Sequence, residues 1–143
     1  EYVGRIKWLR SDGSIKELHR PAAEPAETVD TLEPCFVLLH TDLICKYQLR
    51  FDPFFDFHIY AEELSIRARL LYGVQSKIIN LQSLHYSKGV KNENFYNKYI
   101  TLVRKYPNEL FSTMSTGIED LLIMRRALGL DTAKKYRSML LIP

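Results

Sequence analysis

Near its start the chain alternates between hydrophobic and polar residues in the manner of β-strands. Residues 2–9 and 14–18 follow this alternation, and the Ser-Asp-Gly-Ser sequence between them offers a glycine for the positive φ of a tight turn. We therefore predict a β-hairpin here. Residues 29–39 become continuously apolar after Pro34, which predicts a strand buried on both faces.

Helical spacing of apolar residues dominates the rest of the chain. Residues 61–72 place Leu64, Ala68 and Leu71 on one face, and Gly73 follows at the position of a helix C-cap. This pattern predicts a helix over 61–72. The other predicted elements are a strand over 74–80 and helices over 41–47, 94–106, 116–129 and 132–141.

This order of elements predicts a mixed α/β fold with a helical C-terminal tail. The strands over 29–39 and 74–80 are expected in one sheet, with the 61–72 helix packed against it. Three partners stay open for the tail helices: the sheet, another subunit or a membrane surface. Leu121, Leu122, Met124, Ala127 and Leu128 are read as core residues.

The length of 143 residues corresponds to one domain, or to part of one, over 1–143. Within it we expect a sheet-containing portion, 1–89, and a helical extension, 90–143. The chain begins at Glu1 without a Met and, by its pattern, in mid-strand, which indicates a fragment.

Composition narrows the class of protein. The hydrophobic fraction of 46% and the charged fraction of 26% are typical of a folded globular chain, so we expect order over most of its length. The net charge of +3 is scattered rather than concentrated in a basic patch, so nucleic acid is not an expected partner. No apolar run reaches the roughly 18 residues that suggest a spanning helix.

The two cysteines, Cys35 and Cys45, lie in apolar sequence without a Cys-x-x-Cys spacing. This arrangement argues against a zinc site. We read both as buried, reduced thiols rather than as a disulfide, which favours a cytoplasmic location.

The residues with the most chemical content lie between 29 and 89. The segment Glu-Pro-Cys-Phe-Val-Leu-Leu-His covers 33–40, FDPFFDFHIYAEELSIRARL covers 51–70, and His-Tyr-Ser-Lys-Gly covers 85–89. These segments resemble, in order and spacing, the second half of family-2-type, GT-A-fold glycosyltransferases. Members of that family show an acid before an apolar strand, then a motif like "FDE-F-FH-YD-DLSLRAR-AG", and then "HYS-GS".

The resemblance implies the C-terminal, acceptor-side part of a GT-A nucleotide-diphospho-sugar transferase fold. It also implies sugar transfer from a nucleotide-diphosphate sugar to a saccharide or lipid-linked acceptor, which is metal-dependent and of the inverting type. Such a reaction needs a base for the acceptor hydroxyl and positive charge on the departing diphosphate, commonly Mn²⁺ or Mg²⁺.

The acidic pair Glu62 and Glu63 opens the 61–72 helix, where the helix dipole favours ionised carboxylates. In the family the second acid of this pair is typically the base, usually as Asp, so the resemblance places that role on Glu63. Local sequence alone favours a different reading, in which Glu63 pairs with Arg67 four residues on. Arg67 and Arg69 are read as ion-pairing helix residues.

Several other residues are candidates by the same resemblance. His85 corresponds to a histidine that joins the metal ion in related enzymes, and imidazole suits Mn²⁺. Glu33 corresponds to an acid that faces the donor sugar or acceptor, and Lys88 offers an ammonium donor to phosphate. His58 and Tyr60 either contact the acceptor or, in the plainer reading, His58 caps a hydrophobic cluster of Phe51, Phe54, Phe55 and Phe57.

Family enzymes hold the metal with an Asp-x-Asp motif that ends their nucleotide-binding half, and this sequence contains none. We therefore expect the donor site to be completed by a preceding N-terminal half or by another subunit. The rival reading is a non-catalytic interaction module that keeps a degenerate transferase fold. The expected location is cytoplasmic, with membrane-surface association left open.

Overall fold

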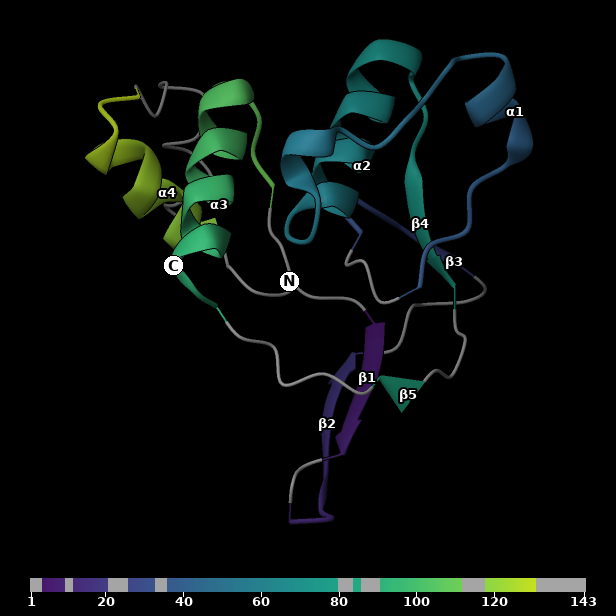
Figure 1. Cartoon of the computed structure of the whole chain (residues 1–143), viewed down its shortest axis with the longest axis vertical. Helices are drawn as coiled ribbons and strands as arrows, with labels where there is room; N and C mark the ends of the chain where they lie inside the picture. The colour runs from purple at the N-terminus through teal and green to yellow at the C-terminus, as the bar shows by residue number, and fades with distance from the viewer. Residues whose placement is uncertain are drawn as a thin grey trace, which may run out of the picture.

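The computed structural model describes residues 4–9, 12–20, 26–32, 36–79, 84–85, 91–111 and 118–130. Within these residues the chain is mixed α/β, as the sequence predicts. Figure 1 shows the helices gathered at one end of the molecule and a β-hairpin projecting at the other.

That hairpin joins β1 (Gly4–Leu9) to β2 (Ile15–Arg20) in antiparallel register. Its turn depends on Gly13, whose φ of 79° is a conformation that side chains other than glycine rarely adopt. The Asp12 carboxylate accepts hydrogen bonds from the backbone N–H and the hydroxyl of Ser14, at 2.9 and 2.6 Å. The predicted hairpin is therefore confirmed.

A third strand, β5 (Leu84–His85), pairs in parallel with β1 through Lys7↔Leu84 and Trp8↔His85. The strand order of this sheet is β2-β1-β5. The sequence pattern does not predict this pairing, because two residues are too few to show an alternation.

The second sheet pairs β3 (Ala26–Val29) with β4 (Ser76–Ile79) in antiparallel register. The predicted strand over 29–39 is wrong in its extent: β3 ends at Val29, and residues 36–40 are irregular. Phe36 and Leu38 are exposed, whereas Leu39 is partly buried against the small core that contains Leu64. The apolar run therefore contacts the core on one side only, instead of lying between two layers.

The helix α2 (Tyr60–Tyr72) confirms the predicted 61–72 helix. Gly73 ends it in the left-handed region at φ 67°, and its N–H bonds back to the carbonyls of Ala68 and Arg69. Leu64 and Ala68 pack in a small core with Leu49. Leu71, expected on the same face, is instead exposed.

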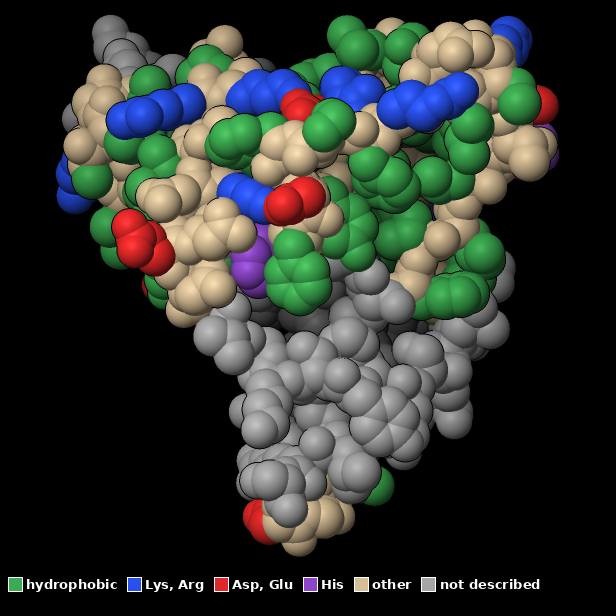
Figure 2. Space-filling model, viewed as in Figure 1, with side chains coloured by type: hydrophobic (Ala, Val, Ile, Leu, Met, Phe, Trp, Pro, Cys, Tyr) green, Lys and Arg blue, Asp and Glu red, His purple; other side chains and the backbone are tan. Residues whose placement is uncertain are grey.

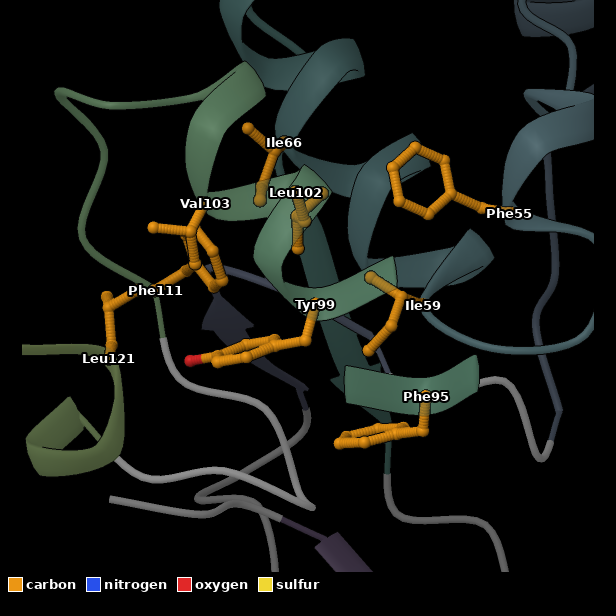
Figure 3. Close-up of a cluster of buried hydrophobic side chains, with 9 residues drawn as sticks. All are labelled: Phe55, Ile59, Ile66, Phe95, Tyr99, Leu102, Val103, Phe111 and Leu121. Atoms are coloured by element: carbon orange, nitrogen blue, oxygen red, sulfur yellow. The ribbon is translucent and has the colours of Figure 1, made fainter. Parts of the chain in front are cut away.

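The main core lies where α2 meets α3 (Glu93–Lys105), α4 (Ile118–Ala127) and the short 3-10 helix η1 (Pro53–Phe55). Figure 3 shows its side chains converging from these elements. The members are Phe55, Ile59, Ile66, Phe95, Tyr99, Leu102, Val103, Phe111 and Leu121. The expected division between 1–89 and 90–143 thus passes through one continuous core.

The helix starts differ slightly from those predicted. His40, rather than Thr41, caps α1 (Thr41–Cys45), and its Nδ1 accepts the N–H of Asp42 at 3.2 Å. Asn92 caps α3 by accepting the N–H of Phe95 at 3.0 Å. The helix predicted over 132–141 lies outside the described residues.

Three further outcomes concern the surface and the tail. Cys45 is a free, exposed thiol, so its predicted burial is wrong, and Cys35 lies outside the described residues. Leu121 is fully buried, but Ala127 is exposed at the end of α4. No helix among the described residues has the length and apolar character needed to cross a membrane.

Candidate functional site

The acidic pair lies in the first turn of α2, and the structure buries both residues. Glu62 is 3% exposed and Glu63 is 0% exposed. The residue before the helix, Ile59, has a φ of 66°, which is a strained conformation for a β-branched side chain and costs about 1–2 kcal/mol. Its buried side chain packs in the main core, and this packing stabilises the strained backbone conformation from which α2 begins.

The Glu63 carboxylate accepts hydrogen bonds from three side chains. Arg67 binds both oxygens, with Nε 2.9 Å from Oε1 and Nη2 3.1 Å from Oε2. The Lys105 ammonium and the Tyr106 hydroxyl each lie 2.8 Å from Oε1. The ion pair with Arg67 that local sequence favours is therefore confirmed.

These contacts decide the charge of the site. Burial by itself raises the pKa of Glu63, but the bonds from Arg67, Lys105 and Tyr106 outweigh it and leave that pKa below its usual value. Conversely, the bond to Glu63 raises the pKa of Arg67. The pKa of Tyr106 is raised mainly by burial and secondly by the hydrogen bond to Glu63, so its hydroxyl stays protonated. At neutral pH the site thus holds an ionised carboxylate.

Lys105 is shared between two carboxylates. Its Nζ lies 2.8 Å from Glu63 Oε1 and 2.8 Å from Asp52 Oδ2. Asp52 also caps η1 by accepting the N–H of Phe54 at 3.0 Å. The bond from Lys105, then that from Phe54, lowers the pKa of Asp52. A chain of alternating charges therefore joins η1, α2 and the end of α3.

The two aromatic candidates lie beside this turn. The His58 ring is half-buried, with its centroid 4.7 Å from that of Phe57 and 5.6 Å from that of Phe95. The Tyr60 ring meets Phe51 edge-on at 5.5 Å. Each of the two rings thus has an exposed aromatic neighbour, Phe57 or Phe51.

The predicted phenylalanine cluster is wrong in part. Phe55 is buried in the core, whereas Phe51, Phe54 and Phe57 are exposed, Phe57 to 73%. Figure 2 shows hydrophobic side chains at the surface over the half of the molecule that carries α1 and α2. His58 therefore contacts one core ring and one surface ring rather than capping a closed cluster.

The structure describes no side chain of the remaining candidates, Glu33, Lys88 and His85, and so places none of them at this turn. Glu33 and Lys88 lie outside the described part of the chain. The backbone of His85 pairs with Trp8 in the first sheet, and its side chain is outside the described set. The described residues contain no group of three or more His, Cys, Asp or Glu that could hold a metal ion, so they do not by themselves fit a complete metal site.

Sequence reasoning missed three members of the site: Asp52, Lys105 and Tyr106. Lys105 and Tyr106 lie 42 and 43 residues after Glu63, at the end of a helix read as part of a tail. No local pattern indicates so distant a contact. Asp52 carried a usable signal, because an Asp directly before a Pro is typical of a helix N-cap.

Comparison of the chain with protein-family models, with curated proteins and with solved structures finds no match.

Proposed function

We propose that this chain is the acceptor-side part of a GT-A-fold glycosyltransferase, with Glu63 as the base that takes the proton of the acceptor hydroxyl. The observation that carries the proposal is the first turn of α2. It holds two buried acids, three and four residues after Ile59, whose backbone is strained in the left-handed region. Strained backbone beside buried ionisable groups is a combination that clusters at active sites.

The geometry of Glu63 suits a proton acceptor at one of its two oxygens. Oε1 accepts bonds from Arg67, Lys105 and Tyr106, whereas the described structure shows one donor to Oε2, the Arg67 Nη2. A carboxylate oxygen can accept two hydrogen bonds, so Oε2 can accept one more. Glu63 is 0% exposed, so an acceptor hydroxyl would reach Oε2 only after the side chains that cover it have moved. The N-terminal position in α2 further favours the ionised carboxylate.

The proposed reaction is a single displacement at the anomeric carbon of the sugar. The acceptor oxygen forms the new bond to that carbon as its proton passes to Glu63 Oε2. The bond to the nucleoside diphosphate breaks, and the diphosphate leaves with the electron pair. Attack from the side opposite the leaving group inverts the anomeric configuration. The acceptor is a saccharide or a lipid-linked sugar, and His58 and Tyr60 offer aromatic surface for its rings.

A divalent cation, Mn²⁺ or Mg²⁺, would supply positive charge at the departing diphosphate, with His85 as the proposed ligand from this chain. The described residues do not make a complete site for it. We propose that the other ligands and the nucleotide pocket lie outside this chain.

One observation favours a second candidate, a non-catalytic interaction module. Glu63 is 0% exposed and fully engaged at Oε1, which is what a purely structural ion pair requires. In that case no donor sugar would be turned over, and the exposed Phe51, Phe54 and Phe57 would be contact residues for another protein.

Product formation separates the two candidates. The full-length protein is incubated with uridine, guanosine and thymidine diphosphate sugars, Mn²⁺ and a panel of saccharide and lipid-linked acceptors. We expect one donor to give a transferred sugar with inverted configuration, identified by NMR. Absence of transfer from every donor, with a folded protein, would contradict the enzyme and favour the interaction module.

A further inference from the structure

The bonds around Glu63 leave one donor in excess at Oε1. That oxygen accepts the Arg67 Nε at 2.9 Å, the Lys105 Nζ at 2.8 Å and the Tyr106 Oη at 2.8 Å. A carboxylate oxygen has two lone pairs, so three donors compete for them. One of the three can therefore leave without exposing an unsatisfied acceptor.

Lys105 is the donor best able to leave. Its ammonium keeps a second carboxylate partner, Asp52 Oδ2, at 2.8 Å when the contact with Glu63 opens. Its side chain is 35% exposed, so the freed N–H can bind water. Arg67 lacks this freedom because it binds both Glu63 oxygens and also the carbonyl of Arg50.

We propose that Lys105 is a positioning residue that switches Glu63 between two states. In the closed state Lys105 bridges Glu63 and Asp52, and in the open state it stays with Asp52 alone. The open state is the one in which Glu63 takes up a proton. The catalytic meaning of this switch rests on the proposed function, whereas the switch itself is a property of the side chains described here.

The open state answers a difficulty in the proposed reaction. The contacts with Arg67, Lys105 and Tyr106 lower the pKa of Glu63, and a base is most effective when its pKa lies near the working pH. Withdrawal of the Lys105 charge removes one of these contacts and raises the pKa of Glu63. Among the described residues, the charged or titratable groups that face Glu63 are Arg67, Lys105 and Tyr106, with Asp52 acting through Lys105.

The chain offers a matched control for Lys105. Lys98 lies on the same helix, seven residues earlier and so two turns along one face. Its ammonium pairs with Asp56, just as that of Lys105 pairs with Asp52. Both lysines thus tie α3 to the segment around η1, but Lys105 is the one that contacts Glu63.

The test measures the protonation of Glu63 by carbon-detected NMR titration of its carboxyl group in this chain. We expect Lys105→Met to move the titration midpoint of Glu63 upward and Lys105→Arg to return it toward wild type. Asp52→Asn should move the midpoint downward, because Lys105 then has Glu63 as its remaining carboxylate. Lys98→Met should leave the midpoint unchanged. An unchanged midpoint in Lys105→Met, or an equal shift in Lys98→Met, would overturn the switch.

Kinetics of the full-length protein separate this inference from the proposed function. Titration shifts of opposite sign in Lys105→Met and Asp52→Asn, together with no sugar transfer from any donor, would support the switch and contradict the enzyme. The opposite result is also informative. If sugar transfer requires Glu63, but the acidic limb of the kcat–pH profile is the same in wild type and Lys105→Met, the enzyme would be supported and the switch overturned.

Discussion

Replacing Glu63 with Gln should destabilise the fold considerably, because this one carboxylate anchors residues from two helices. Glu63→Gln keeps the side-chain size but removes the charge that Arg67 and Lys105 face. It also turns an N–H₂ group toward donors that need an acceptor. The Tyr106 hydroxyl then competes with the cations for a single amide oxygen.

The structure sets the size of this effect. Removing one partner of a buried ion pair typically costs about 3–5 kcal/mol. The side chains of Arg67 and Lys105 are 21% and 35% exposed, so water recovers part of the loss. We therefore expect the free energy of unfolding to fall by about 2–3 kcal/mol.

The assay is urea denaturation followed by circular dichroism, with Glu109→Gln as the control. Glu109 pairs with Arg69 at 2.9 Å, but both side chains are partly exposed, so this substitution should cost about 0–1 kcal/mol. Equal losses in Glu63→Gln and Glu109→Gln, or a loss below about 0.5 kcal/mol in Glu63→Gln, would show that the Glu63 carboxylate does not anchor the two helices.

Three further outcomes test the fold. The lowered pKa values of Glu63 and Asp52 contribute stability that is complete above about pH 5 and is lost as the pH falls through those values, so the urea midpoint should drop on acidification; a pH-independent midpoint would contradict this. In Gly73→Ala the added Cβ would meet no atom within 4 Å, but alanine would have to adopt a φ of 67°, so we expect the free energy of unfolding to fall by about 1–2 kcal/mol. No loss would argue against the left-handed conformation at residue 73. Phe55→Ala should cost about 3–5 kcal/mol of unfolding free energy because its ring is buried, whereas the exposed Phe57→Ala should change it by less than about 0.5 kcal/mol. Thermal melts check this, and a lower melting temperature for Phe57→Ala than for Phe55→Ala would contradict the described burial.

The parts of the fold that the sequence predicts well depend on local signals. Gly13 and Gly73 mark the hairpin turn and the end of α2, because only glycine readily adopts the positive φ found at both. The predicted strand over 29–39 is wrong in its extent because a continuous apolar run shows hydrophobicity but not how many faces of the strand are covered. Phe36 and Leu38 are exposed in the structure, so this run lacks the second layer that the prediction assumed.

The candidate site divides in the same way. The Glu63–Arg67 pair is visible from sequence because its members are four residues apart on one helix. The contact of Lys105 with Asp52 spans 53 residues and exists only because α3 packs against α2 and η1. Such a contact follows from tertiary packing, and no residue pattern near Asp52 or Lys105 encodes it.

The most direct test of the account is the kcat for sugar transfer by Glu63→Gln in the full-length protein, measured below its melting transition at saturating donor. The amide retains the size of the carboxylate but cannot take the acceptor proton, so kcat should fall by about 10²- to 10⁴-fold while the donor Kd stays unchanged. Glu63→Asp should keep part of the activity, and Glu62→Gln should lose less than Glu63→Gln. A wild-type kcat in Glu63→Gln would contradict the assignment of Glu63 as the base.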